Sequence, residues 1–419
     1  MGFIHSLIGI ASLIAIAVLF SKKRKHINLR TVGLAFGIQF GLGAFVLFVP
    51  VGQKILGSIS DGVSAVIAYG AKGSEFLFGG LVSGKMFELF GGGGFVFAIR
   101  VLPMIVFFSA LISVLYYTGV MGWLVKTLGG ALHKALGTSR AESMSAAANI
   151  FVGQTEAPLV VKPYISRMTE SELFAVMVGG MASIAGSVLA GYAGMGVPLP
   201  YLIAASFMAA PGGLLMAKLM LPETEKPQEI EGKINFTAEG ETPPANLIDA
   251  AASGASTGMW IALNVGAMLI AFVGIIALID GMIGGIAGFF GYEGVTLDKI
   301  FGYLFAPLAW LIGAPWADAQ IAGSFIGQKL VINEFVAYSN YTAHLANAEA
   351  IVLTEKSKAI IAFALCGFAN FGSVATLVGG LSIMAPNRRA DIARLGLFAL
   401  LAGTLSNLMS ATIAGLFIG

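Results

Sequence analysis

Long apolar runs separated by short polar stretches dominate the chain. An α-helix needs about 20 consecutive apolar residues to cross a lipid bilayer. Eight stretches meet this requirement: residues 3–20, 31–50, 98–120, 172–195, 200–221, 258–285, 358–384 and 394–418. The pattern therefore predicts an all-α protein with eight transmembrane helices.

Residues 53–94 are apolar in part but carry charges that are spaced too closely for a helix that faces lipid. These charges are Lys54, Asp61, Lys72, Glu75, Lys85 and Glu88. We interpret this region as interfacial or peripheral helices that end in the run Gly91–Gly94. The run lacks the Lys-Ser/Thr that follows the glycines of a phosphate-binding loop, so we expect it to be a flexible joint.

The composition agrees with a membrane protein. Hydrophobic residues make up 57% of the chain and charged residues only 11%, and the mean hydropathy is +0.87. A soluble globular protein carries about 25% charged residues. Too few charges remain to cover a surface in water, which excludes a cytosolic enzyme, a disordered tail and a protein that binds nucleic acid. The single cysteine, Cys366, excludes a disulfide framework and a cysteine-based metal site.

Basic residues indicate the orientation of the chain. The cluster Lys22–Lys25 follows the first apolar run, whereas a signal peptide would place its charges first, so we expect a retained first helix. Positive loops face the cytoplasm. The loops near Lys134 and Arg388 and the polar linker 222–246 are then cytoplasmic, and both termini lie outside.

Successive crossings place these loops in the cytoplasm and both termini outside only if residues 141–171 and 318–350 do not cross the membrane. Both stretches are polar in the middle and apolar around it. A broken helix at membrane depth is tolerated where it lines a cavity or is buried in protein. We therefore predict two re-entrant hairpins that open from opposite sides, with tips at 153–158 and 333–338.

A similar pair of short motifs follows each predicted hairpin. Thr169-Glu170 and then Ala185–Val188 follow the first, and Thr354-Glu355 and then Phe371–Val374 follow the second. Because the two units start on opposite sides, they form an inverted repeat. Secondary transporters with inverted repeats bind substrate near the middle of the membrane, where discontinuous helices meet.

Glu156 and Glu334 lie at the centres of the two predicted hairpin tips. A carboxylate at membrane depth costs about 2.5–3.5 kcal/mol on insertion scales. The other explanation, an interfacial glutamate that reaches water, suits the glutamates near predicted membrane edges. A carboxylate in a membrane cavity can accept hydrogen bonds from a hydroxylated substrate, bind a cation or carry a proton.

Uncharged polar residues accompany the first carboxylate. Gln154, Thr155 and Asn149 suit a neutral polar ligand, as does Asn333 beside the second carboxylate. Free carbonyl groups near Asn149 and Val152 could coordinate Na⁺, with the Ser183 hydroxyl completing an oxygen shell. The alternative for Ser183 is a hydroxyl that bonds back to its own helix.

The run Phe368–Ser373 interrupts the apolar stretch 358–384. Asn370 and Ser373 are three residues apart and share a face if the segment is helical. An aromatic ring beside an amide and a hydroxyl could stack on a planar base and bond a sugar. Core packing with hydrogen bonds between helices is the alternative.

At these positions the chain resembles the concentrative nucleoside transporter family, as a bacterial Na⁺-coupled nucleoside symporter. The matching motifs are Gly153-Gln154-Thr155-Glu156-Ala157-Pro158, then Gly327-Gln328-Lys329 followed by Asn333-Glu334-Phe335-Val336-Ala337-Tyr338, and Cys366-Gly367-Phe368-Ala369-Asn370. The resemblance covers essentially the whole chain and fits the shorter bacterial form with eight crossings.

The resemblance implies Na⁺-driven uptake of nucleosides such as uridine by a homotrimer in the bacterial inner membrane, without an organic cofactor. It implies that a transport domain moves against a scaffold. The implied base-facing residues are Gln154, Thr155 and Glu156, with Val188 nearby and Phe368 packed on the base. The implied ribose ligands are Glu334, Asn370 and Ser373, and the implied Na⁺ ligands are Asn149, Val152, Ser183 and Ile184.

The chain then divides into eight segments. The predicted scaffold comprises 1–94, 95–140 and 247–317, and the predicted transport domain comprises 141–197 and 318–386. The remaining segments are a fifth helix (198–221), a cytoplasmic linker (222–246) and an eighth helix (387–419).

Other functions remain open at this stage. A H⁺-coupled nucleoside carrier could use Glu156 or Glu334 as the proton carrier, and a channel would pass substrate without accumulating it. Gly254–Gly258 matches the G-x-S-x-G motif of serine hydrolases, which needs a strand–turn–helix setting and a histidine partner. This segment opens a predicted transmembrane helix, so we expect no enzyme.

Overall fold

The computed structural model describes residues 2–90, 95–228, 244–347 and 349–418, and within them the fold is all-α without a strand. The predicted run Gly91–Gly94 lies outside the described residues. The helices are α1 (Gly2–Leu19), α2 (Leu29–Leu47), α3 (Pro50–Phe78), α4 (Lys85–Phe90), α5 (Phe97–Arg100), α6 (Leu102–Tyr117), α7 (Val120–Leu136), α8 (Arg140–Ala148), α9 (Lys162–Ile165), α10 (Glu170–Ala182), α11 (Gly186–Gly194), α12 (Leu199–Met220), α13 (Leu247–Phe289), α14 (Leu297–Leu311), α15 (Trp316–Val331), α16 (Glu334–Ala346), α17 (Glu355–Leu365), α18 (Phe371–Met384) and α19 (Arg389–Ile418).

Each predicted crossing coincides with an apolar helix or with two helices separated by a short break. Within the described residues, six spans are long and apolar enough to cross a membrane, or seven if the bent pair α14–α15 counts as one. Helix α1 and helix α18 are apolar but shorter. The stretches 172–195 and 358–384 contain the breaks, between α10 and α11 and between α17 and α18.

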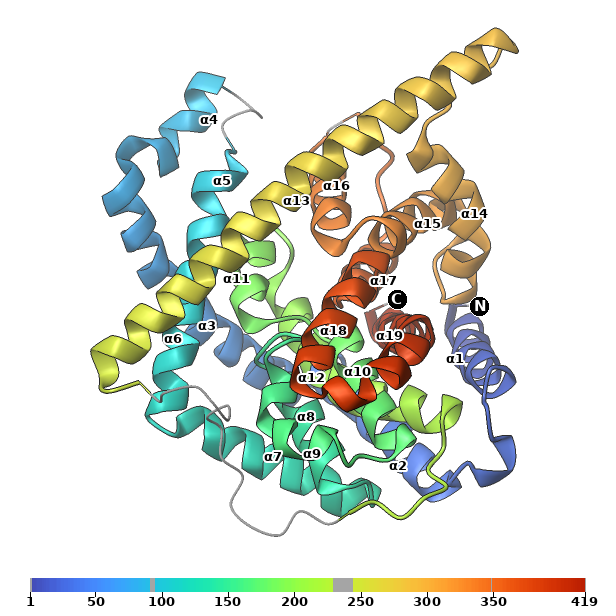
Figure 1. The fold of residues 1–419 in the computed structure, drawn as a ribbon. Coiled ribbons are helices and arrows are strands. Elements are labelled where there is room, and N and C mark those ends of the chain that lie inside the picture. Colours follow the sequence, from blue (N-terminus) through green and yellow to red (C-terminus); the bar gives the residue numbers. More distant parts are fainter. Residues whose placement is uncertain (1, 91–94, 229–243, 348, 419) are drawn as a thin grey trace.

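Helix α19 lies at the centre of the molecule. It packs against α10, α12, α17 and α18, and most of its side chains beyond Leu395 are buried. Helix α13 is the opposite case: it runs diagonally across the front in Figure 1 and packs along α6. Only 6% of the apolar window of α13 is buried. The core therefore surrounds the broken helices, whereas α13 presents an apolar face to its surroundings.

The described part of the charged region, up to residue 90, contains the long helix α3 and the short helix α4 at one side of the molecule (Figure 1). Helix α3 is not among the spans that are apolar enough to cross. This agrees with the predicted peripheral position of the region.

Two helical hairpins occupy the predicted positions. In the first, α8 packs against the 3-10 helix η4 (Ala157–Val161), and in the second, α15 packs against α16. The sequence pattern did not predict α14, which packs closely along α15 and meets it at an angle of 116°. The helix has 15 residues, fewer than the about 20 that a membrane crossing needs, so the search for crossings did not find it.

Candidate substrate and cation site

The two broken helices begin in the same way. Thr169 caps α10: its hydroxyl accepts from the Glu172 amide at 3.1 Å, and the Glu172 carboxylate accepts from the Thr169 amide at 2.9 Å. Thr354 caps α17, where its hydroxyl accepts from the Ser357 amide at 3.2 Å. The repeated Thr-Glu pair of the sequence thus starts a broken helix in each half, which supports the predicted internal repeat.

The first break lies against the tip of the first hairpin. Helix α10 ends before Ser183, whose backbone is extended (φ −106°, ψ 172°), and the Gly186 amide donates to the Phe151 carbonyl at 2.9 Å. A Cβ built on Gly179 would lie 3.0 Å from the Asn149 amide nitrogen. A glycine at this position therefore allows the hairpin tip to approach α10 closely.

The predicted Na⁺ ligands come together at this contact. The Ser183 hydroxyl lies 3.3 Å from Asn149 Oδ1 and also donates to the Gly179 carbonyl at 2.9 Å, so the back-bonding alternative is realised as well. Val152 and Ile184 are buried, and among the described residues neither carbonyl oxygen accepts a hydrogen bond.

The chemistry of this donor set fits a hard cation. Hard cations such as Ca²⁺ and Mg²⁺ prefer oxygen ligands from backbone carbonyls, amides and carboxylates. Two buried carbonyl oxygens, an amide oxygen and a hydroxyl supply such ligands here. Among the described residues, no group of three or more His, Cys, Asp or Glu side chains is placed to hold a metal ion. The four candidate Na⁺ ligands are uncharged groups.

Glu334 lies at the start of α16 and is 4% exposed. The Tyr192 hydroxyl donates to Glu334 Oε1 at 3.0 Å, and the Asn370 amide donates to Glu334 Oε2 at 2.8 Å. Asn370 Oδ1 in turn accepts from the Ser373 amide at 2.7 Å and caps α18. Asn333 caps α16 by accepting from the Val336 amide at 2.9 Å. The structure thus brings Glu334, Asn370 and Ser373 into one hydrogen-bonded group.

The base-facing candidates of the first hairpin are arranged more loosely. Gln154 is buried, and its Oε1 has no hydrogen-bond partner among the described residues, whereas Thr155 is exposed. The Glu156 carboxylate accepts from the Gly153 amide at 3.3 Å. Among the described residues, no hydrogen bond joins Glu156 to Glu334 or to its partners, so the two carboxylates belong to separate groups.

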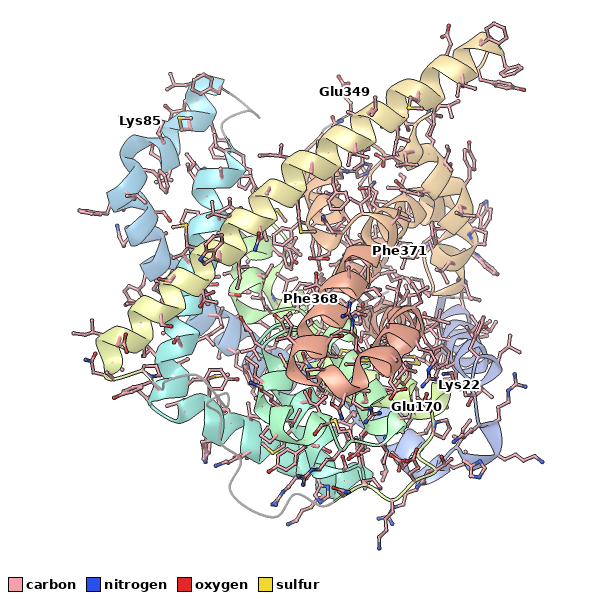
Figure 2. All side chains as sticks on the ribbon, in the orientation of Figure 1. Lys22, Lys85, Glu170, Glu349, Phe368 and Phe371 are labelled. Carbon is pink, nitrogen blue, oxygen red and sulfur yellow. The ribbon has the colours of Figure 1, made fainter. Side chains whose placement is uncertain are left out.

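Phe368 joins the two halves of the site. Its amide donates to the Ser183 carbonyl at 3.0 Å, so the break of α17–α18 is bonded to the break of α10–α11. Its ring is half-buried and lies 4.0 Å from the position of a Cβ built on Gly153 at the first hairpin tip. Figure 2 labels Phe368 at this break and Phe371 at the start of α18.

Three residues of this region received no role from the sequence. Tyr192 sits one helical turn after Val188, which is buried on α11, so this i, i+4 spacing could have pointed to it. Lys329 belongs to a family motif and donates to Asn407 Oδ1 of α19 at 2.8 Å. Nothing local marks Asn407, which is separated from Lys329 by 78 positions.

Comparisons with known families cover most of the chain. A family model described as "Na⁺ dependent nucleoside transporter C-terminus" matches residues 201–415, and its N-terminal counterpart matches residues 8–81. A third model, described as "Nucleoside recognition", matches residues 98–199.

Individual proteins are similar over their full length. An uncharacterized transporter of Haemophilus influenzae is 62% identical, with 100% of this chain and 99% of that protein covered. The nucleoside permease NupC of Helicobacter pylori is 55% identical, with 99% and 98% covered. The solved structure of CNTnw in an inward-facing substrate-bound state has 68% identity and a TM-score of 0.95, with 100% of this chain and 98% of that chain covered. The chain therefore belongs to the concentrative nucleoside transporter family, and it is a membrane-embedded nucleoside transporter rather than an enzyme.

Proposed function

We propose that this transporter is a symporter that imports nucleosides such as uridine with the Na⁺ gradient. The observation that carries the proposal is the hydrogen bond from the Phe368 amide to the Ser183 carbonyl. Ser183 is a candidate Na⁺ ligand, and Phe368 is a candidate substrate residue. An ion that orders one break therefore also orders the other, which is the physical requirement for coupling two ligands.

The nucleoside would lie between the two groups of polar residues. Glu334, Asn370 and Ser373 would bind the ribose, because vicinal hydroxyls are donors that a buried carboxylate accepts. Gln154, Thr155 and Glu156 would face the base, with Val188 and Phe368 packed beside it. The unpartnered Gln154 Oε1 supports a ligand at this point, since a buried polar atom usually has a hydrogen-bond partner.

Na⁺ would bind between Asn149, Val152, Ser183 and Ile184. An ion at this position would hold the first hairpin tip against the break of α10–α11 before the nucleoside binds. Inward movement of one Na⁺ contributes about 2.3 kcal/mol per 100 mV of membrane potential, in addition to its concentration gradient.

The proposal includes a placement in the membrane. The two hairpins would be re-entrant from opposite sides of the bacterial inner membrane, and both termini would lie outside. The packing of α1 against α19 supports termini on one side. Alternating access would move the hairpins and broken helices against a scaffold that includes α6 and α13. The exposed apolar face of α13 supports a contact between the subunits of a homotrimer.

Uptake of radiolabelled uridine into proteoliposomes tests the proposal. With an inward Na⁺ gradient at fixed pH, we expect accumulation above the external concentration. Replacement of Na⁺ by choline should abolish this accumulation. Accumulation that persists in choline and follows an inward pH gradient would establish H⁺ coupling, and equilibration without accumulation would establish a channel.

A further inference from the structure

The second hairpin contains a buried cationic side chain. Lys329, near the end of α15, is 2% exposed, and it lies in the electrostatic field of the Glu334 carboxylate. Its ammonium group donates to Asn407 Oδ1 at 2.8 Å. A buried charge is costly unless it is paired and hydrogen-bonded, so these contacts explain how the ammonium can remain inside the protein.

Asn407 connects this ammonium group to both helix breaks. Its amide nitrogen donates to the Ala182 carbonyl at 2.6 Å and to the Cys366 carbonyl at 3.1 Å. These carbonyls belong to the C-terminal ends of α10 and α17, where helices leave carbonyl groups without partners and carry partial negative charge. One side chain of α19 therefore satisfies both interrupted helices and accepts from the cation of the second hairpin.

The neighbouring backbone is fitted to this side chain. A Cβ built on Gly367 would collide with the Asn407 amide. Glycine at 367 therefore permits the close approach that the bond between Asn407 and Cys366 requires. This fit involves a residue in the break itself, so Asn407 holds the break rather than a remote part of α17.

We propose that Lys329 and Asn407 are positioning residues that couple the Na⁺ and nucleoside sites, an inference that rests on the proposed Na⁺ symport. The ammonium group polarises the Asn407 amide and strengthens its two donor bonds, as hydrogen bonds in a chain reinforce one another. Those bonds hold the ends of α10 and α17 in a fixed relation. Ordering of Ser183 by Na⁺ is thereby transmitted to Phe368 and Asn370, which follow Cys366 in the second break.

A simpler role for Lys329 would be to balance the charge of Glu334 without holding the breaks. Three substitutions distinguish the roles. Asn407→Asp keeps an acceptor for the ammonium group but removes both N–H donors. It therefore breaks the two bonds to the ends of α10 and α17, which we call the clamp, and leaves both Lys329 and Glu334 in place. Lys329→Met removes the ammonium group and keeps a side chain of similar length, and Lys329→Arg restores the charge.

The experiment measures the coupling factor, defined as the ratio of uridine affinities with saturating Na⁺ and with choline, by calorimetry on the purified full chain. Lys329→Met and Asn407→Asp should each lower this factor about tenfold, which is within the usual range of coupling between two sites. Lys329→Arg should recover part of the loss. Ser410→Ala is the matched control, because Ser410 is buried on the same helix and accepts from Gln39 of α2 at 3.0 Å. This variant should keep the wild-type factor.

The outcomes separate this inference from the function on which it rests. A wild-type protein that binds uridine equally with and without Na⁺ would overturn the proposed symport and the clamp with it. Wild-type coupling that survives in Asn407→Asp would overturn the clamp alone. If Lys329→Met does not give a monodisperse protein, Asn407→Asp still decides, because it leaves the buried charge paired.

Discussion

The two helical hairpins each place a glutamate near the helix breaks, but they hold it differently. Glu334 of the second hairpin accepts from Tyr192 and Asn370 and lies in the field of Lys329. Glu156 of the first accepts from a backbone amide at 3.3 Å and forms no ion pair within the described part of the chain. The second hairpin therefore carries its own cation, and its glutamate is hydrogen-bonded to α11 and to the break before α18. At the tip of the first hairpin, the Val152 carbonyl oxygen accepts no hydrogen bond within the described part of the chain, which favours the binding of a mobile cation there.

The bases of the hairpins show a related contrast. Glu142 at the start of α8 forms an ion pair with Lys218 at 2.6 Å, and Lys218 also donates to Ser171 at the start of α10. At the start of α15, Asp318 accepts from the Thr354 hydroxyl at 2.7 Å and from Ser357 at 2.6 Å. In each half an acidic residue connects the hairpin to the following broken helix. The two halves thus share the same link between hairpin and broken helix, although different residues form it.

The opposite orientation of the hairpins gives the largest expected effect. In a Cys366→Ala background, a thiol reagent that cannot cross the membrane should label Ala343→Cys from outside and spare Arg140→Cys. Both positions are exposed in the structure, so burial does not protect either one. Labelling of both from outside would mean that the hairpins do not open to opposite sides.

Replacement of Glu334, whose carboxylate accepts from Tyr192 and Asn370, should give the next largest effect. Glu334→Gln keeps the shape of the side chain but loses a strong acceptor for the ribose and for its two donors. Hydrogen bonds to a charged group contribute about 1.5–3 kcal/mol each, so uridine affinity should fall about a hundredfold. Calorimetry on a monodisperse sample measures the change. Wild-type affinity would remove Glu334 from the ribose site.

A smaller effect is expected for the donor that the sequence did not predict. Tyr192→Phe removes the hydroxyl that orients Glu334 and leaves the aromatic packing against Phe335 and Tyr338. Loss of one hydrogen bond to a carboxylate should weaken uridine binding about tenfold. Tyr201→Phe on α12 is a matched control and should bind uridine as the wild type does.

The first hairpin should respond through Na⁺ instead. Ser183→Ala removes one oxygen ligand of the candidate cation site and its contact with Asn149. The concentration of Na⁺ for half-maximal uptake should rise about three- to tenfold, as expected for a modest change in one ligand. Uridine affinity at saturating Na⁺ should change less. An unchanged half-saturation would show that Ser183 supplies no required ligand.

The sequence predicted what depends on local pattern. Apolar runs located the crossings, and polar interruptions located both hairpin tips and the break at Phe368–Ser373. Helix α14 was missed, because its 15 residues are fewer than the about 20 that a membrane crossing needs. Tyr192 and Asn407 were missed because their partners are 142 and 225 positions away in the chain, at Glu334 and Ala182. Such pairs are created by helix packing, and the only local signal was the i, i+4 spacing between Val188 and Tyr192.

Reciprocal binding of the two ligands tests the central claim most directly. If Na⁺ and the nucleoside share one coupled site, each must raise the affinity for the other by the same factor. Uridine affinity is measured by calorimetry with and without Na⁺, and Na⁺ affinity from the thermal stabilisation by Na⁺ with and without uridine. Our account predicts equal factors well above one. Factors of one in both titrations would show that the contact between Ser183 and Phe368 couples nothing.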